Sequence, residues 1–196
     1  MDFKVNFGYF FSVLGEFMLR GVRLSENKIV DVSILTTGGT IEKTYDEQDG
    51  VLDNRESIIK NILLSRLRLP YTRLNIVPIL CKDSLNMNED DRAFLLLMIK
   101  KEMELKNPIV VLHGTDSMAL SASYCQEKIK NIEVPLIFTG AMKPLGFLDS
   151  DASQNVTEAL LAAKIIRPGV YISFHNRIFD VPNVKKNKEA GTFEAF

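Results

Sequence analysis

Four short segments of the 196-residue chain combine hydroxyls, carboxylates and glycines, and each follows an apolar run. Hydroxyls and carboxylates can hold a small polar molecule, and glycine lets backbone amides approach it closely. Small hydroxyl residues after one strand are ordinary turn chemistry, but their recurrence after four strands favours a common site. The segments are 36–40 (TTGGT), 82–84 (KDS), 113–117 (HGTDS) and 139–142 (TGAM).

The elements that must position these segments alternate between strand and helix. Apolar, β-branched runs predict strands, and apolar residues at helical spacing predict the helices between them. Continuous apolar strands in such an alternation are typical of a parallel sheet covered by helices on both faces. We therefore expect a single-domain, three-layer α/β/α fold with a mostly parallel, Rossmann- or flavodoxin-like sheet. The predicted strands are 29–35, 74–80, 109–114, 134–140 and, as the last, 169–174, and the predicted helices are 55–67, 87–105, 117–130 and 155–166.

The carboxyl ends of parallel strands are where such a sheet binds its ligands, because loops from neighbouring strands converge there. All four polar segments follow predicted strands. We therefore expect them to meet in one pocket.

The composition excludes several classes of protein. Hydrophobic residues make up 46% of the chain and charged residues 25%, which excludes a disordered chain. The 24 Lys and Arg residues against 25 Asp and Glu residues leave a net charge of −1, which disfavours a nucleic-acid-binding protein. Cys81, Cys125 and two histidines are too few for a disulfide framework, a structural zinc or a His-rich metal site. These counts favour a cytoplasmic protein without a metal.

Residues 1–27 form an amino-terminal extension of unknown role. Its apolar run, 5–19, follows Lys4 as in a secretory signal, but Glu16 interrupts the run and no small-residue cleavage site follows. The run is also too short to span a bilayer. We favour an amphipathic leader, or an extension upstream of a start at Met18, over a signal peptide. Residues 28–196 are expected to form one domain that ends in a polar tail, 184–196.

Five motifs carry a family resemblance: ILTTGGTIEKTY, KDSLNM, VVLHGTDSMALSA, PLIFTGAMKP and DSDASQN. In this order they resemble the signatures of the bacterial L-asparaginase/glutaminase amidohydrolases. The carboxyl-terminal stretch GVYISFHNRIFDVPNVKKNKEAGTFE resembles the ending of short-chain members, which have only the N-terminal domain of the long ones. The resemblance covers roughly residues 30–196 and rests on the combination of motifs, since TGGT alone is a weak signal.

The resemblance implies a catalytic centre of Thr40, Tyr45, Thr115 and Asp116. Thr40 matches the family nucleophile, whose hydroxyl needs activation by a nearby base or charge network. Tyr45 matches a tyrosine on a mobile loop that relays the proton, and the polar segment 46–50 would act as a lid. An exposed loop aromatic is the alternative reading of Tyr45.

Thr115 and Asp116 match the second threonine and the acid of the family. A carboxylate can hold the α-ammonium group of an amino acid by a charge-assisted hydrogen bond, and Thr115 would position water or help activate Thr40. Alternatively, Thr115 or Ser117 caps the helix that begins there. The resemblance also implies a set of substrate-binding residues: Gly39, Asp83, Ser84, Gly114 and Ala141. Asp83 beside Lys82 has an ordinary surface ion pair as its alternative.

Long family members complete a Thr-Asp-Lys group with a lysine, whose position in this sequence is left open. Lys164, Arg177, Lys186 or no residue fills the role. The second domain of long members also donates substrate contacts across a subunit interface, so the carboxyl-terminal tail or a partner's loop would have to close the pocket here. His113 ends a predicted strand, where we expect a neutral structural histidine.

The function implied is cleavage of the side-chain amide of L-asparagine to L-aspartate and ammonia through a threonine acyl-enzyme, as in asparagine catabolism. We expect no cofactor, no nucleic acid and no membrane as partners, and a homodimer or larger homo-oligomer acting on a small amino acid. The preference between asparagine and glutamine stays open, because one methylene is worth only about 1–3 kcal/mol. The alternatives are a catalytically weak amino-acid-binding homologue, and an ammonia-supplying subunit of an amide-transfer or cell-envelope assembly.

Overall fold

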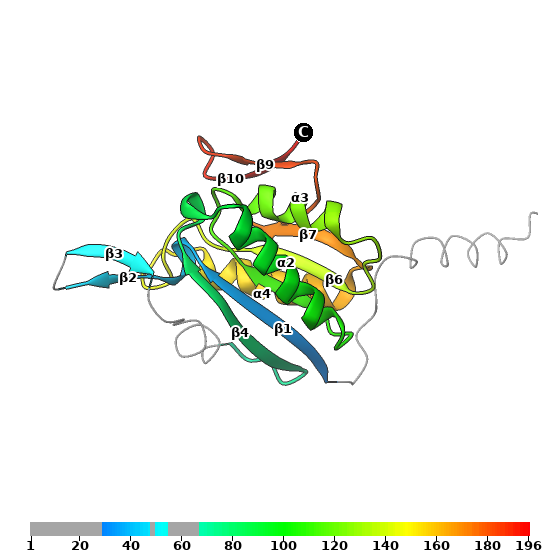
Figure 1. Ribbon diagram of the computed structural model, residues 1–196. Coiled ribbons are helices and arrows are strands. Elements are labelled where there is room, and N and C mark those ends of the chain that lie inside the picture. Colours follow the sequence, from blue (N-terminus) through cyan, green and yellow to red (C-terminus); the bar gives the residue numbers. More distant parts are fainter. Residues whose placement is uncertain (1–28, 48–49, 55–66) are drawn as a thin grey trace, which may run out of the picture.

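A six-stranded sheet forms the centre of the computed structural model, which describes residues 29–47, 50–54 and 67–196. The strand order is β4-β1-β5-β6-β7-β8, and every neighbouring pair is parallel except β7 with β8 (Figure 1). The mostly parallel sheet predicted from the sequence is therefore confirmed. The strands are β1 (Val30–Gly38), β4 (Thr72–Lys82), β5 (Ile109–Leu112), β6 (Pro135–Thr139), β7 (Gly169–Phe174) and β8 (Arg177–Asp180).

The first five of these strands, taken in chain order, have the spatial order 2-1-3-4-5 of a flavodoxin-like sheet. The order reverses between β1 and β5, and ligands of such sheets bind at that switch point. In the register, Thr36 of β1 lies opposite Leu112 of β5. The loops that follow these two strands therefore leave the sheet side by side.

Helices cover both faces of the sheet, as predicted. α2 (Glu89–Met103) and α3 (Met118–Lys128) share one apolar core with alternate strand residues such as Leu35 and Val111. α4 (Ala152–Ile165) packs on the other face against the intervening residues, such as Ile34 and Val110. Continuously apolar strands arise because both faces of each strand are buried.

α2 begins at a capping box formed by Asn88 and Asp91. The Asn88 side chain accepts a hydrogen bond from the Asp91 backbone N–H at 2.9 Å, and the Asp91 carboxylate accepts one from the Asn88 N–H at 3.0 Å. This reciprocal capping box satisfies two backbone donors that the first turn would otherwise leave open. It fixes the start of α2 and, through the preceding residues, the loop after β4.

The carboxyl-terminal region differs from the predicted polar tail. β7 is not the last strand, because β8 follows it, and β9 (Val184–Asn187) pairs with β10 (Thr192–Ala195) as an antiparallel hairpin. Phe193, 1% exposed, anchors this hairpin in the core against Phe174, with ring centroids 5.0 Å apart. Val184, 3% exposed, lies in the same core. Two widely separated apolar residues among charged neighbours give little periodic signal, which is why the sequence pattern misses the hairpin.

A second hairpin, of β2 (Lys43–Asp46) and β3 (Val51–Asn54), extends away from the sheet (Figure 1). The predicted lid, 46–50, lies at its tip, and residues 48–49 are outside the described residues. Most of the predicted helix 55–67 and the whole extension 1–27 are also outside them.

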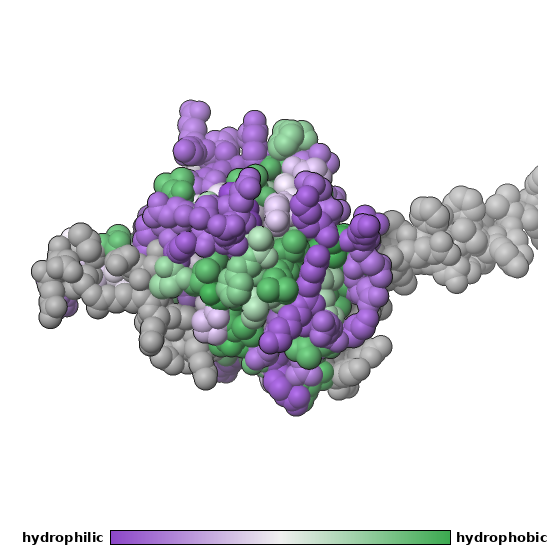
Figure 2. Space-filling view, in the orientation of Figure 1, coloured by the Kyte–Doolittle hydropathy of each residue, from purple (hydrophilic) through white to green (hydrophobic). Residues whose placement is uncertain are grey.

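The surface turned to the viewer in Figure 2 has hydrophobic residues at its centre and hydrophilic residues around them. Phe94 and Leu97 on α2 contribute exposed apolar side chains. Among the described residues, none of the helices has the length and apolar character needed to cross a membrane.

Candidate active site

The loops after β1 and β5 touch through their glycines. A Cβ atom added to Gly39 would lie 2.4 Å from the Cα of Gly114, and Gly39 has a φ of +80° that side-chain-bearing residues rarely adopt. The Gly39 N–H also donates to the Lys82 carbonyl at 2.9 Å, which ties in the loop after β4. The residues that follow the two glycines are Thr40 and Thr115, so the two predicted catalytic threonines lie on adjoining loops.

The loop after β4 packs against the same place. A Cβ atom on Gly114 would lie 2.5 Å from both Cβ and Oγ of Ser84. The Ser117 hydroxyl donates to the Ser84 carbonyl at 2.7 Å. Ser117 precedes α3 but makes no side-chain capping bond, so the alternative that it caps the helix is wrong. Its hydroxyl instead joins two of the predicted site loops.

The loop after β6 completes the group. A Cβ atom on Gly140 would lie 2.2 Å from the His113 carbonyl oxygen, and the following residue, Ala141, is 1% exposed. Leu145 N–H donates to the Ile41 carbonyl at 3.3 Å and so connects this loop to the residues after Thr40. The four strand ends therefore meet at one edge of the sheet, as the sequence predicts.

Thr40 begins a short 3₁₀ turn, η1 (Thr40–Glu42), and is half-buried. The turn is held by the Glu42 carboxylate, which accepts the Gly38 N–H at 2.8 Å. Gly38, with a φ of +90°, turns the chain back toward Lys82 at the end of β1. The consequence is that Thr40 stands at the switch point rather than within the strand.

Lys186 completes a Thr-Asp-Lys group. Its Nζ donates to Thr115 Oγ1 at 2.7 Å and to Asp116 Oδ1 at 3.0 Å. Its side chain is only 18% exposed, and it reaches the site from β9. The other two candidates lie elsewhere: Lys164 donates to Thr72 Oγ1 at 3.0 Å, and the Arg177 guanidinium stacks 5.9 Å from the Phe179 ring.

Asp83 pairs with a lysine that the sequence analysis did not single out. Lys43 Nζ lies 2.6 Å from Asp83 Oδ2, which joins the segment after Thr40 to the loop after β4. The hydrogen bond from Lys43 lowers the pKa of Asp83, with smaller contributions from the Leu85 N–H and the charge of Lys186. A basic residue three positions after Thr40 is the one signal in the sequence that could have indicated this pair.

The alternative reading of Asp83 as a partner of Lys82 is wrong. Lys82 Nζ lies 2.7 Å from the Asp91 carboxylate at the start of α2, and this bond lowers the pKa of Asp91. Because Lys82 pairs with Asp91, the ion-pair partner of Asp83 is Lys43.

Tyr45 lies on β2 opposite Leu52 of β3, and 64% of it is exposed. In this structure it matches the alternative of an exposed aromatic on a projecting hairpin.

His113 is a structural histidine, as expected. It is 0% exposed, and burial lowers its pKa to about 4, so the ring is neutral near pH 7. Its Nδ1 lies 2.8 Å from the Gly114 carbonyl oxygen. Its ring packs edge-on against Phe138, with the two ring centroids 6.1 Å apart. The neutral tautomer with a proton on Nδ1 donates to that carbonyl and fixes the peptide between Gly114 and Thr115.

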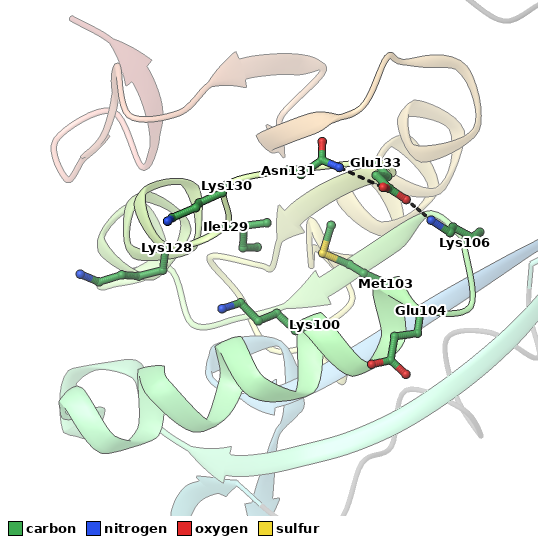
Figure 3. A pocket seen from close by; sticks show the side chains of 9 residues that line it. All are labelled: Lys100, Met103, Glu104, Lys106, Lys128, Ile129, Lys130, Asn131 and Glu133. Carbon is green, nitrogen blue, oxygen red and sulfur yellow. Dashed lines mark hydrogen bonds and ion pairs between the residues drawn. The ribbon is translucent and has the colours of Figure 1, made fainter.

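The pocket in Figure 3 lies at the opposite edge of the sheet, where β5 and β6 begin. It has a volume of about 490 Å³ and includes four lysines: Lys100, Lys106, Lys128 and Lys130. Lys106 is ion-paired with Glu133. α2 and α3 end beside it, and lysines stabilise the negative ends of helix dipoles. This chemistry explains the lysines without a ligand. Within the described ranges, no group of three or more His, Cys, Asp or Glu side chains could hold a metal ion.

The chain is similar to known proteins over most of its length. A family model described as "Asparaginase, N-terminal" matches residues 31–196. The chain is 35% identical over 130 residues to the 60 kDa lysophospholipase of Homo sapiens, covering 66% of this chain and 22% of that protein. It is 31% identical over 172 residues to L-asparaginase 1 of Escherichia coli (strain K12), covering 84% of this chain and 49% of that protein.

A solved structure shares the fold. The thermostable L-asparaginase from Thermococcus kodakarensis matches with a TM-score of 0.74 at 26% identity, covering 85% of this chain and 51% of that one. The chain thus spans about half the length of these asparaginases or, for the lysophospholipase, less. Because the family model covers most of its length, the chain belongs to the asparaginase family and corresponds to the N-terminal domain of that family.

Proposed function

We propose that the protein is an amidohydrolase that cleaves the side-chain amide of L-asparagine to L-aspartate and ammonia, with Thr40 as nucleophile. The observation that carries the proposal is the pair of bonds from Lys186 to Thr115 and Asp116, on the loop that touches Gly39. A hydroxyl, a carboxylate and an ammonium group joined beside a second hydroxyl are the parts that an acyl transfer needs.

In this mechanism, Thr40 Oγ attacks the amide carbon, and the C–N bond breaks after the nitrogen takes up a proton. As the new C–O bond forms, the hydroxyl proton of Thr40 passes to the phenol oxygen of Tyr45, which gives its own proton to the leaving nitrogen when its hairpin closes. Water then attacks the acyl ester, and its proton returns to Thr40. Lys186 donates to Thr115 Oγ1, so the Thr115 hydroxyl proton is directed away from it, toward the attacking water or Thr40.

Substrate recognition follows from the charges at the site. The Asp116 carboxylate holds the α-ammonium group, and the Ser84 hydroxyl donates to the α-carboxylate. Asp83 contributes a second carboxylate whose charge Lys43 partly balances. Gly39 and Gly114 let backbone amides approach the substrate closely enough to stabilise the oxyanion of the tetrahedral intermediate, and Ala141 presents its backbone carbonyl or amide to the scissile side-chain amide.

The proposal also includes a cytoplasmic location and a homodimer in which the partner shields the site from water. Light scattering during size-exclusion chromatography tests the assembly, and a mass equal to one chain contradicts the homodimer.

The test of the reaction is ammonia release from L-asparagine and L-glutamine by the protein and by Thr40→Ala. We expect kcat to fall by at least about 10⁴-fold in this variant. Thr40→Ser, which keeps a hydroxyl, is the matched control and should retain measurable turnover. Equal turnover in Thr40→Ala and the parent contradicts the assignment of the nucleophile. Binding of asparagine by calorimetry without ammonia release favours the amino-acid-binding alternative.

A further inference from the structure

We propose that His175 is a positioning residue that fastens the β9–β10 hairpin to the body of the protein and thereby holds Lys186 against Thr115 and Asp116. This inference rests on the proposed function, because it gives Lys186 a part in turnover. Its structural half, the fastening of the hairpin, can be tested without any activity.

Lys186 depends on its hairpin for its position. β9 and β10 have four residues each and form a two-stranded sheet separate from the central one. A two-stranded hairpin is marginally stable by itself in water, so its place on the protein must come from anchors. Phe193 in β10 and Val184 in β9 provide apolar anchors in the core. Thr192, the neighbour of Phe193 in β10, provides a polar one through His175.

The His175 ring bridges the hairpin to the start of α4. Its Nδ1 lies 3.0 Å from Thr192 Oγ1, and its Nε2 lies 2.9 Å from Asp151 Oδ2. Burial raises the pKa of Asp151, but bonds from the Met142 and Lys143 N–H groups and from His175 outweigh it, so the pKa is lowered. The carboxylate is therefore ionised and only accepts, which places a proton on Nε2. When Nε2 carries the only ring proton, Nδ1 accepts a hydrogen bond from the Thr192 hydroxyl.

The same turn is tied to the loop after β6, one of the four site loops. The His175 N–H donates to Asn155 Oδ1 at 3.1 Å. The other end of that amide, Nδ2, donates to the Gly140 carbonyl at 3.0 Å and to Asp151 Oδ2 at 2.8 Å. Asn155 is 0% exposed, so this connection is protected from water. His175 thus stands between one loop of the site and the hairpin that delivers Lys186.

The turn between β7 and β8 accepts His175 without requiring it. His175 and Asn176, which form this turn, have φ values of 45° and 62°. His and Asn are among the side-chain-bearing residues that adopt a positive φ most often, so the backbone is compatible with both. What distinguishes the histidine from an asparagine at this position is the pair of contacts that its ring makes with Thr192 and Asp151.

The test is His175→Asn in the full chain. Asn tolerates a positive φ, so the turn is kept, but its side chain is too short to join Thr192 and Asp151. We expect kcat for asparagine to fall about 10- to 100-fold with a smaller change in KM, because Lys186 loses its fixed position. Hydrogen exchange should quicken at the amides of 184–187 and 192–195 and stay unchanged in β1 and β5.

Two further variants separate positioning from general damage. Glu158→Gln alters the carboxylate that accepts the Asn176 N–H at 2.7 Å in the same turn, so it is the matched control and should leave turnover unchanged. In a Lys186→Met background, His175→Asn should cause no further loss, since it acts through that lysine. An unchanged kcat, an independent second loss, or unchanged exchange in the hairpin overturns the inference. If the parent releases no ammonia, the proposed function fails, while the exchange comparison still decides whether His175 fastens the hairpin.

Discussion

The two edges of the central sheet both carry lysines, yet they differ in what those lysines contact. At the amino edge, where the parallel strands β5 and β6 begin, four lysines surround a pocket of about 490 Å³ beside the ends of α2 and α3 (Figure 3). At the carboxyl edge, Lys186 donates to two side chains of another loop, and Lys43 pairs with Asp83 of the loop after β4. Glycines there bring backbones so close that a Cβ atom on Gly39 would overlap Gly114.

This difference shows that neither the volume of a pocket nor the number of charged side chains around it is enough to identify a functional site in this fold. The amino-edge lysines are accounted for by helix ends and by acidic neighbours such as Glu133. The carboxyl-edge groups come from segments far apart in the chain, and the glycine contacts have no role in stabilising a helix end. Convergence of chemically matched groups is what distinguishes the carboxyl edge.

Among the variants that test the difference between the two edges, Lys186→Met should have the largest effect. The variant removes the ammonium group that donates to Thr115 and Asp116, so we expect kcat for asparagine to fall by about 10²- to 10⁴-fold. The matched control is Lys185→Met, because Lys185 is 58% exposed and pairs with Glu194. Steady-state ammonia release measures both. Equal losses of kcat in the two variants would mean that the contacts of Lys186 with Thr115 and Asp116 matter no more for turnover than an exposed lysine of the same strand.

The next effect concerns the pH dependence of stability at the carboxyl edge. The pKa of His113 is about 4 in the folded protein and near 6.5 in the unfolded chain. Between these values the unfolded chain binds a proton that the folded protein does not. The free energy of unfolding should therefore fall as the pH drops from 6.5 to 4, by about 3 kcal/mol from this residue.

Urea unfolding at several pH values measures this contribution. His113→Asn keeps a hydrogen-bond donor for the Gly114 carbonyl but does not titrate, so its stability should depend less on pH over the same interval. Identical pH profiles for the two proteins would show that His113 is not buried in its neutral form.

A smaller effect is expected from Gly39→Ala. The added methyl group meets the Gly114 backbone, and the φ of +80° is unfavourable for alanine, so unfolding free energy should fall by about 1–3 kcal/mol and turnover should fall with it. Gly146→Ala is the control, because its methyl group would meet nothing within 4 Å. Thermal unfolding and ammonia release are the measurements. A fully active and stable Gly39→Ala would mean that the two loops are not in contact.

The smallest effect is expected at the amino edge. Lys100→Ala and Lys130→Ala remove two of the four pocket lysines, and each should change stability by no more than about 1 kcal/mol, the size of a helix-dipole contribution. Turnover should stay within about twofold of the parent, since neither side chain belongs to the site. A large loss of ammonia release in either variant would make the amino edge part of the function.

The sequence by itself determined the parallel α/β architecture, the main strands and helices that lie within the described residues, and the loops that meet. It did so because burial on both faces produces continuous apolar strands, and because Asn88 and Asp91 cap α2 through contacts between near neighbours. The order of such strands in a sheet then places Thr40 and Thr115 on adjoining loops. Strands, helices and caps can be predicted from the sequence because they depend on periodic burial or on contacts between residues close together in the chain.

Only the tertiary structure decided which lysine joins Thr115 and Asp116, and that Asp83 pairs with Lys43 rather than with its neighbour Lys82. Lys186 is 70 residues from Asp116 along the chain, and it reaches that residue on a hairpin whose Val184 and Phe193 are buried in the core. No periodicity records a contact of that kind, since it depends on how separate elements pack. Two buried side chains, Val184 and Phe193, hold in place a segment that resembles a polar tail in its sequence, and Lys186 on this segment reaches Thr115 and Asp116.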